Sequence, residues 1–522
     1  MRYALTAAEA LRAEQGAIAH GAVTLEMLMD RAGDALAEIV LSVAPPGQVA
    51  VLTGKGNNAG DGWVAARLLH ERGRDVRVFA LAGPDSLSGA AMVAARTAAD
   101  RGVVWSVPDS ALDITHGLLG VSVIIDALFG FGFAGVASEP YASAIIAIND
   151  SDAFVVAADM PSGVHADTGV VTGPAVWADV TVTFSAPKVG ALLEPGASHV
   201  GEIVVSDIGV PRVYVDREGC LEIWDRGDYR GLLPVSGPED HKGSRGRVLT
   251  ITGSRAFAGA AILAARGAAR MGAGYVFAAV PASIAPLLQG AMPHVISRAM
   301  SETSEGTFAT SAGDQLLEST AGVDAVVLGP GLTLHPEAVD IVRRLIAKVR
   351  VPLVVDADAL NAFDVDGPSA LMEREAPTVI TPHPGELGRL LGRSASDIQG
   401  DRVASAAALS GERITCLLKG ARTIVSGHGR AVVTMAGNPG MATAGMGDVL
   451  AGMIGTLLAQ GLPPFEAAAL GAYVHGRAGD LGAAELTQTC LTADDLDSFL
   501  PHAIKELTEV QFPSSAGDGY HQ

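Results

Sequence analysis

Disulfide bonds, zinc sites and membrane spans are all unsupported by this 522-residue sequence. It has three cysteines, Cys220, Cys416 and Cys490, which are far apart and form no CxxC pair. This spacing argues against a disulfide framework or a zinc site, and it fits a reducing, cytoplasmic setting. No run of about 18 uncharged apolar residues occurs, and charged residues interrupt the N-terminal segment. Neither a membrane span nor a signal peptide is therefore predicted.

Positive charge is also scarce. The chain has 36 Lys and Arg against 57 Asp and Glu, which gives a net charge of -21. Such a chain would repel a phosphate backbone unless a local basic patch overrode its charge, and the sequence contains no such patch. A nucleic-acid partner is therefore not expected.

The sequence does contain enough apolar material for two buried cores. Hydrophobic residues make up 49% of the chain, and the 63 glycines are spread along it, which is typical of a globular protein. A single core rarely supports more than roughly 250 to 300 residues. We expect two domains, residues 1–212 and 229–505, joined by a more polar linker, 213–228, and followed by a tail, 506–522.

Short apolar runs alternate with helical patterns over most of the chain. Residues 1–45 are predicted to be helical, with Thr6 and Glu9 as a capping box. Runs such as QVAVLTG, SVIIDALFG and FVVAADMPSG follow, and a second series that includes RVLTITGS, DAVVLGPG and ITCLLKG begins after the linker. Continuous apolar strands are expected where helices cover both faces of a sheet. The predicted fold class is therefore α/β in both domains.

The segment KGNNAGDG, residues 55–62, follows a predicted strand and precedes a predicted helix. It is expected to form a loop at the carboxyl end of the strand, where open α/β sheets bind ligands. Its spacing fits neither a GxGxxG fingerprint nor a Walker loop. Asn57, Asn58 and Asp61 supply oxygens that suit a hard cation or ligand hydroxyls. The alternative is a tight turn whose Asx side chains bond their own backbone, but DALFGFGFAG and DMPSG, at two further strand ends, favour a shared crevice.

Four motifs in this order, GNNAGDG, DALFGFG, DMPSG and FSAPKVG, resemble the N-terminal domain of NAD(P)H-hydrate epimerases over residues 1–212. The resemblance implies a Rossmann-like three-layer sandwich that interconverts the R and S forms of hydrated NADH and NADPH, which carry a hydroxyl at C6 of the nicotinamide ring. It also implies a potassium ion bound by Asn58, Asp126 and Ser162. The residues implied to bind the hydrate are Asn57, Asn58, Ala59, Gly60, Asp61, Gly130, Phe131, Gly132, Phe133, Ala134, Gly135, Val136 and Asp159.

Epimerisation at C6 requires loss and return of the hydroxyl, or opening and closure of the ring, and either route needs a positioned proton-transfer group. Asp159 is the candidate for this role. Lys188, at the end of TFSAPK, is a second cation expected near the same crevice, and the alternative for a lone lysine at a strand end is a solvated charge. Phe131 and Phe133 stand where many relatives have smaller or polar residues.

The segment GMGDVLAG, residues 445–452, leads into an apolar helix. Gly445, Gly447 and Asp448 are therefore expected at a helix N-terminus, where backbone amides can hold a phosphate or a developing negative charge. The alternative is that the aspartate only caps the helix. The strand-end motifs LLKGARTIVSG, GPGL and TPHPGE favour the phosphate interpretation.

HKGSRGRVLTITGS, GPGL, DADALN, TPHPGE and GMGDVLAG together resemble the ADP- or ATP-dependent NAD(P)H-hydrate dehydratases of the ribokinase-like superfamily over residues 229–505. The resemblance implies that Asp448 takes the proton of the C6 hydroxyl as that hydroxyl is phosphorylated, and that elimination of phosphate restores the reduced ring. Mg²⁺ is expected, held partly by nucleotide oxygens. Met446 stands where relatives often have Thr or Ser.

The same resemblance assigns the remaining site residues. Those implied to bind the hydrate are Ala260, Gly331, His383 and Asp448. Those implied to bind the nucleotide are Lys419, Gly420, Ala421, Arg422, Thr423 and Gly447. Taken alone, His383 would be assigned a structural role.

The two resemblances support each other, because a stereospecific dehydratase clears both epimers only if something interconverts them. The predicted function is bifunctional repair of NADHX and NADPHX, with ADP as co-substrate, by a cytoplasmic homo-oligomer. Two alternatives stay open. One is a small-molecule kinase with a regulatory N-terminal domain, and the other is an RNA-processing scaffold, in which domains resembling the N-terminal half also occur.

Overall fold

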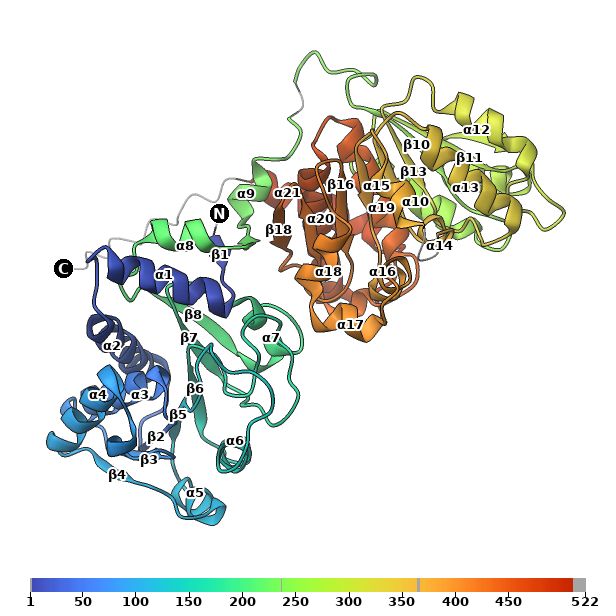
Figure 1. Cartoon of the computed structure of the whole chain (residues 1–522). Coiled ribbons are helices and arrows are strands. Elements are labelled where there is room, and N and C mark those ends of the chain that lie inside the picture. The colour runs from blue at the N-terminus through green and yellow to red at the C-terminus, as the bar shows by residue number, and fades with distance from the viewer. Residues whose placement is uncertain (1, 236, 364–366, 510–522) are drawn as a thin grey trace, which may run out of the picture. The chain divides into compact units, whose positions relative to one another are not determined.

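The computed structural model describes residues 2–235, 237–363 and 367–509 (Figure 1). The chain divides into two compact units, Arg2–Ile223 and a second unit that begins at Trp224. Both units are α/β with mainly parallel sheets, so the predicted fold class is confirmed. Of the predicted tail, residues 510–522 lie outside the described residues, and helix α21 (Leu496–Thr508) includes 506–508.

A seven-stranded parallel sheet in the order β4-β3-β2-β5-β6-β7-β8 forms the centre of the first unit. Its strands are β2 (Val49–Thr53), β3 (Val76–Ala80), β4 (Val104–Ser106), β5 (Val123–Ala127), β6 (Phe154–Ala158), β7 (Val180–Phe184) and β8 (Glu202–Ser206). The helices are α1 (Ala7–Ala19), α2 (Leu25–Val43), α3 (Asn57–Glu71), α4 (Gly89–Asp100), α5 (Ala111–Gly117), α6 (Tyr141–Asn149) and α7 (Gly196–His199).

Alternate side chains of this sheet belong to two different cores. Val49 and Val51 of β2 pack with α2, α3 and α4 on one face, whereas Ala50 and Leu52 pack with α5 and α6 on the other. Burial of both faces explains why the strands read as continuous apolar runs. The predicted helical N-terminus is also confirmed, and Thr6 and Glu9 form the expected capping box of α1.

Residues 57–62, predicted as a loop, form the first turns of α3 instead. The reason is close packing. A Cβ atom on Gly60 would lie 2.4 Å from Sδ of Met29, and one on Gly62 would lie 2.6 Å from Cβ of Ala127. These two glycines thus let α3 approach α2 and β5, which outweighs the low helix propensity of glycine.

The sheet of the second unit runs in the order β18-β17-β16-β15-β14-β13-β10-β11-β12. The seven strands β10 to β16 pair in parallel with their neighbours in the sheet. Strand β17 pairs antiparallel with both β16 and β18. The strands are β10 (Arg247–Ile251), β11 (Tyr275–Pro281), β12 (Ile296–Met300), β13 (Ala325–Leu328), β14 (Leu353–Val355), β15 (Thr378–Ile380), β16 (Ile414–Leu418), β17 (Ile424–Gly427) and β18 (Arg430–Val433).

Three long apolar helices, α10 (Ala258–Arg270), α19 (Met446–Ala459) and α20 (Pro464–Leu486), share one core with this sheet. Besides α9 (Arg226–Arg230) and α21, the unit contains α11 (Ala285–Ala291), α12 (Gly313–Ser319), α13 (Pro336–Lys348), α14 (Asp358–Asn361), α15 (Pro368–Met372), α16 (Pro384–Leu391), α17 (Ala395–Gly400) and α18 (Arg402–Ala408). No described helix is both long enough and apolar enough to span a membrane.

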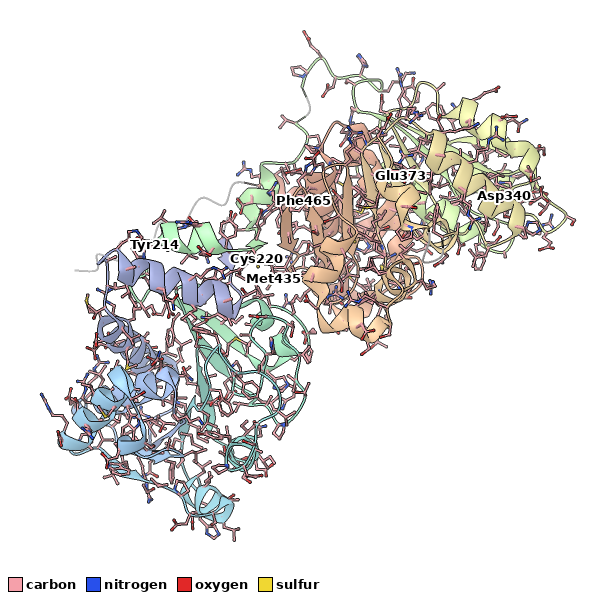
Figure 2. All side chains as sticks on the ribbon, in the orientation of Figure 1. Tyr214, Cys220, Asp340, Glu373, Met435 and Phe465 are labelled. Atoms are coloured by element: carbon pink, nitrogen blue, oxygen red, sulfur yellow. The ribbon has the colours of Figure 1, made fainter. Side chains whose placement is uncertain are left out.

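The stretch predicted as a linker, 213–228, contains regular structure. Helix α8 (Arg212–Glu218), strand β9 (Leu221–Ile223) and the start of α9 (Arg226–Arg230) lie there, and β9 pairs antiparallel with β1 (Arg2–Ala4). These elements are too short to give a periodic signal. Cys220, labelled in Figure 2, and Cys490 are exposed, Cys416 is buried, and all three are free thiols.

Candidate active sites

Asp159 lies directly after β6, with a positive φ of 67° that is unusual for a residue other than glycine. Its carboxylate forms an ion pair with the ammonium of Lys188, and both side chains are buried. Thr183 Oγ1 and the backbone N–H of Phe184 also donate to Asp159, at 3.3 and 3.2 Å. Lys188 is therefore a buried partner of Asp159 and not a solvated charge.

Two further carboxyl groups, Glu14 on α1 and Asp61 on α3, interact electrostatically with this pair. Burial raises the pKa of Glu14 to about 7, Lys188 opposes this rise, and Asp159 adds to it. Burial, Asp159 and Glu14 raise the pKa of Asp61 well above its ordinary value. Three acidic side chains and one lysine thus share a desolvated region, an arrangement that suits proton transfer. Sequence reasoning missed Glu14, because nothing in a helical N-terminus marks which of its acids lies near Asp159 and Lys188.

The three predicted potassium ligands, Asn58, Asp126 and Ser162, lie together. Ser162 donates to Asp126 from its hydroxyl (2.7 Å) and from its backbone N–H (2.8 Å). Asn58 Nδ2 donates to the carbonyl of Phe129 (2.9 Å), and Phe129 N–H donates to Ser162 Oγ (2.9 Å). Asn58 Oδ1 is buried and has no described hydrogen-bond partner. Burial raises the pKa of Asp126 to about 6, and its hydrogen bonds oppose that rise.

The remaining predicted hydrate contacts of this unit divide into accessible and enclosed residues. Phe131 approaches the buried pair, with its ring centroid 5.4 Å from Lys188 Nζ, and Phe133 stacks on Phe129. Val136 is 61% exposed, whereas Ala59 is fully buried inside α3. Other predicted contacts on the loop that follows β5 are exposed, namely Gly132, Ala134 and Gly135.

In the second unit, strand ends bring together a network of charges centred on Lys419. Its Nζ lies 2.8 Å from Oδ1 of Asp356, which follows β14, and 3.8 Å from Oε2 of Glu386. Glu386 Oε1 in turn lies 3.6 Å from Nε2 of His383. Burial lowers the pKa of Lys419, but Asp356 and Glu386 outweigh burial and the pKa is raised overall. Asp356 precedes Ala357, whose φ of 49° marks a strained backbone at this strand end.

Helix α19 begins beside this network. A Cβ on Gly447 would lie 3.4 Å from Nζ of Lys419 and 3.8 Å from Oδ2 of Asp356, which places the helix N-terminus against the lysine. Burial raises the pKa of Asp448 to about 7; Asp356 and Asp358 add to the rise, and Lys419 opposes it. A carboxyl group that titrates near neutral pH can serve as a general base there.

The predicted hydrate residues Ala260 and Gly331 also come together. A Cβ on Gly331 would lie 2.9 Å from Cβ of Ala260. The preceding glycine of the same motif, Gly329, approaches the carbonyl of Asp356 too closely to carry a side chain. The GPGL loop thus links this pair of residues to the charged network.

The predicted nucleotide segment 419–423 forms the turn between β16 and β17. Gly420 and Arg422 have positive φ angles, and Thr423 Oγ1 donates to the carbonyl of Gly420 at 3.1 Å. Arg402 Nη2 donates to the carbonyl of Lys419 at 3.3 Å. His383, by contrast, uses Nδ1 to cap α16, which is the structural role that it was assigned when taken alone.

Comparisons with known proteins cover both units. Residues 248–502 match the family described as NAD(P)H-hydrate dehydratase, and residues 25–190 match the YjeF-related protein N-terminus. The bifunctional NAD(P)H-hydrate repair enzyme Nnr of Moorella thermoacetica is 42% identical over 533 residues, which cover 99% of each chain. The enzyme of the same name from Escherichia coli is 34% identical over 95% of this chain and 92% of its own. The solved ADP/ATP-dependent NAD(P)H-hydrate dehydratase of Bacillus subtilis, co-crystallised with ATP/Mg²⁺, is 28% identical, covers 55% of this chain and 99% of its own, and has a TM-score of 0.48.

Proposed function

The chain belongs to the family of bifunctional NAD(P)H-hydrate repair enzymes, with an epimerase domain and a dehydratase domain, and we propose here which residues carry out each reaction. This membership gives no support to a kinase with a regulatory N-terminal domain or to an RNA-processing scaffold. The observation that carries the assignment of residues is that each unit sets one acidic residue beside a lysine. Asp159 forms an ion pair with the buried Lys188, and Asp448 interacts electrostatically with the half-buried Lys419.

For epimerisation, we propose that Asp159 exchanges a proton with the hydroxyl oxygen on C6 of the substrate. Lys188 holds the carboxylate of Asp159 in place. Inversion by loss and return of the hydroxyl needs a proton delivered to the leaving oxygen and one removed from the returning water. Glu14 and Asp61, whose pKa values burial raises, are suited to hold the second proton. Both protons would then stay within one desolvated cluster.

The residues around Asn58 fit a potassium ion. The buried, unpartnered Oδ1 of Asn58 is an orphan acceptor beside the buried carboxylate of Asp126, and oxygen donors of this kind suit a hard cation. We propose that Asn58, Asp126 and Ser162 hold K⁺, with the Phe129 carbonyl nearby. The ion would supply the positive charge that this desolvated carboxylate lacks and would order the strand-end loops.

For dehydration, we propose that Asp448 removes the proton of the C6 hydroxyl of the S hydrate as its oxygen bonds to the terminal phosphorus of ADP and the bond to the nucleotide breaks. Phosphate is a better leaving group than hydroxide, so the C6–O bond then breaks and loss of a proton from C5 restores the double bond. The products are AMP, phosphate and NAD(P)H. Lys419 and the N-terminus of α19 stabilise the charge on the transferred group.

Segment 419–423 and Gly447 are proposed to hold the nucleotide, and Ala260, Gly331 and His383 the hydrate. Mg²⁺ would be held chiefly by nucleotide oxygens, since the described residues contain no cluster of three or more His, Cys, Asp and Glu suited to a metal. ADP is proposed as co-substrate, and a homo-oligomer in the cytoplasm as the working form. The free thiols are compatible with a reducing compartment.

Stereochemically resolved product analysis tests the division of labour. The pure R hydrate of NADH is incubated without nucleotide, and the S hydrate is measured by chromatography. Asp159→Asn is expected to abolish S formation, and Asp448→Asn to leave it at the wild-type rate. Normal S formation by Asp159→Asn would contradict the assignment of the epimerase site.

A further inference from the structure

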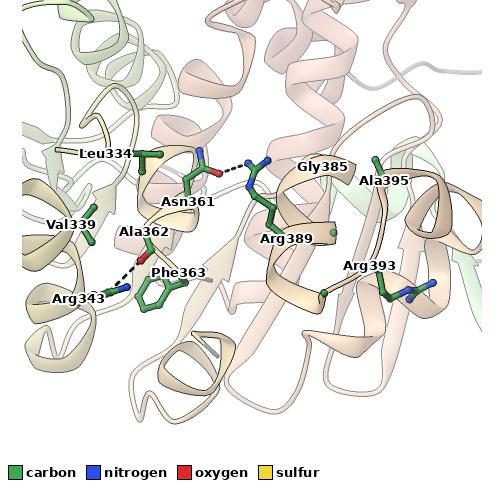
Figure 3. A pocket seen from close by; sticks show the side chains of 12 residues that line it. Leu334, Val339, Arg343, Asn361, Ala362, Phe363, Gly385, Arg389, Arg393 and Ala395 are labelled. Atoms are coloured by element: carbon green, nitrogen blue, oxygen red, sulfur yellow. Dashed lines mark hydrogen bonds between the residues drawn. The ribbon is translucent and has the colours of Figure 1, made fainter. Parts of the chain in front are cut away.

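A cavity of about 730 Å³ lies between α13, α14 and α16 of the second unit (Figure 3). Leu334, Val339 and Phe363 give it an apolar wall, and Arg343 and Arg389 enter it from opposite sides. None of these five residues is among those assigned above to the hydrate or the nucleotide.

The two arginines are held in place by neutral partners. Arg343 Nε donates to the carbonyl of Ala362 at 3.3 Å, and Arg389 Nη2 donates to Oδ1 of Asn361. Within the described residues neither guanidinium has a carboxylate within 4.0 Å, and the terminal nitrogens of Arg343 donate no described hydrogen bond. Two guanidinium groups that have no ion-pair partner among residues 2–235, 237–363 and 367–509 form a candidate site for an anion in a chain of net charge -21.

Arg393 also borders the cavity but is committed elsewhere. Its Nη1 donates to Ser405 Oγ at 3.2 Å and its Nη2 to the carbonyl of Asp397 at 3.0 Å. Figure 3 shows its guanidinium directed away from the other two arginines. We therefore restrict the site to Arg343 and Arg389.

Helices α14 and α16 connect the lining of the cavity to the strand ends of the dehydratase site. Helix α14 begins two residues after Asp356, and it ends at Asn361, the partner of Arg389. Helix α16 is capped by His383 and carries Arg389 six residues later, about 9 Å along a helix axis. A ligand anchored at the strand ends and longer than this distance would reach the arginines.

We propose that the Arg343–Arg389 cavity binds a phosphate group of the dinucleotide hydrate during dehydration, while the apolar wall packs against its adenosine. This inference rests on the proposed dehydratase site. The co-substrate ADP is assigned to segment 419–423 and Gly447, so the dinucleotide is the other phosphate-bearing ligand. Two of its groups have the required chemistry: the diphosphate, present in both hydrates, and the 2′-phosphate, present only in the NADPH hydrate. Guanidinium groups bind either one through paired N–H donors.

Steady-state kinetics with both S hydrates at saturating ADP distinguish these groups. We expect Arg343→Gln and Arg389→Gln to raise KM for the hydrate about 10- to 100-fold, as loss of a hydrogen bond between charged groups does, with kcat changed less than about twofold. A rise for the NADPH hydrate alone identifies the 2′-phosphate, and a rise for both hydrates identifies the diphosphate. Arg350→Gln is the matched control, because Arg350 is exposed, lies outside the cavity and pairs with Glu375.

Unchanged KM values in both variants, or a rise in KM for ADP in place of the hydrate, would overturn the proposal. Calorimetric binding of NADPH hydrate to Asp448→Asn, with and without Arg343→Gln, gives a readout that needs no turnover. Arg343→Gln should weaken that binding by the same factor. A failure of the proposed dehydratase site can be told apart from a failure of the arginine proposal. If the dehydratase site is wrong, Asp448→Asn retains dehydration, independently of the KM values of the arginine variants.

Discussion

Lys188 and Asp159 form an ion pair whose two side chains are 2% and 4% exposed, beyond the carboxyl ends of β6 and β7 in the first unit. Three hydrogen-bond donors converge on the same Asp159 oxygen: the lysine ammonium, the Thr183 hydroxyl and the Phe184 amide. The carboxylate is thus held rigidly, which is what a positioned proton-transfer group requires.

Removal of Lys188 alone is predicted to destabilise the first unit. Lys188→Met would leave a buried carboxylate without its partner, at a cost of about 3 to 5 kcal/mol. The double variant Asp159→Asn, Lys188→Met removes both charges and should recover most of that loss without recovering epimerisation. Urea unfolding followed by tryptophan fluorescence measures this, because Trp63, Trp105 and Trp177 belong to the first unit. Equal stabilities of the single and double variants would show that the pair is not coupled.

The potassium assignment predicts a shift in ion dependence. Asn58→Ala removes the orphan oxygen and should raise the K⁺ concentration for half-maximal epimerisation at least about tenfold, the usual effect of losing roughly 1.4 kcal/mol of ligand binding. Melting of the unit in KCl against choline chloride provides a second readout, since a bound ion stabilises the folded state. Identical K⁺ curves for variant and wild type would remove Asn58 from the ligand set.

Dehydration is predicted to depend on pH through Asp448. A general base must be deprotonated, and burial raises the pKa of Asp448 to about 7, so kcat/KM for the hydrate should fall as the pH drops below about 7 and level off above it. Asp356→Asn removes a negative charge that raises this pKa and frees the Lys419 charge that lowers it. The acidic limb should therefore move to lower pH. A limb that moved to higher pH in this variant would contradict the role of Asp448.

Gly447→Ala separates stability from nucleotide binding. The added methyl would meet Lys419 at 3.4 Å, an ordinary contact, and alanine is favoured over glycine inside a helix. We expect unchanged or improved thermal stability, together with a rise in KM for ADP because the methyl occupies the space where backbone amides meet a phosphate. Gly400→Ala, on α17 with open space around it, is the matched control. An unaltered KM for ADP would argue against a phosphate at this helix terminus.

Residues carried by local motifs could be predicted from the sequence, and their long-range partners could not. The strand-end positions of Asp159 and Lys419 follow from apolar runs that end at a polar residue. The hydrogen bond from Lys419 to Asp356 joins residues that are 63 positions apart in the sequence. It forms only because of the order in which the strands are arranged in the sheet. Glu386 was likewise part of a recognised motif without an assigned role.

The start of α3 shows the limit of local propensity. Glycine and asparagine favour turns, so residues 57–62 were predicted as a loop, yet Gly60 and Gly62 are required for close packing of a helix against Met29 and Ala127. Tertiary packing decides the conformation here. The consequence for the site is that Asn58 and Asp61 sit on a rigid helix.

The central claim is that two separate sites in one chain act in succession on the same hydrate. Its most direct test gives a mixture of R and S NADH hydrate, with ADP, Mg²⁺ and K⁺, to the wild type, Asp159→Asn and Asp448→Asn, and follows the return of reduced-nicotinamide absorbance. Full recovery is predicted for the wild type, recovery that slows sharply once the S fraction is consumed for Asp159→Asn, and none for Asp448→Asn. Full recovery at the wild-type rate by Asp159→Asn, or any enzymatic recovery by Asp448→Asn, would contradict the account.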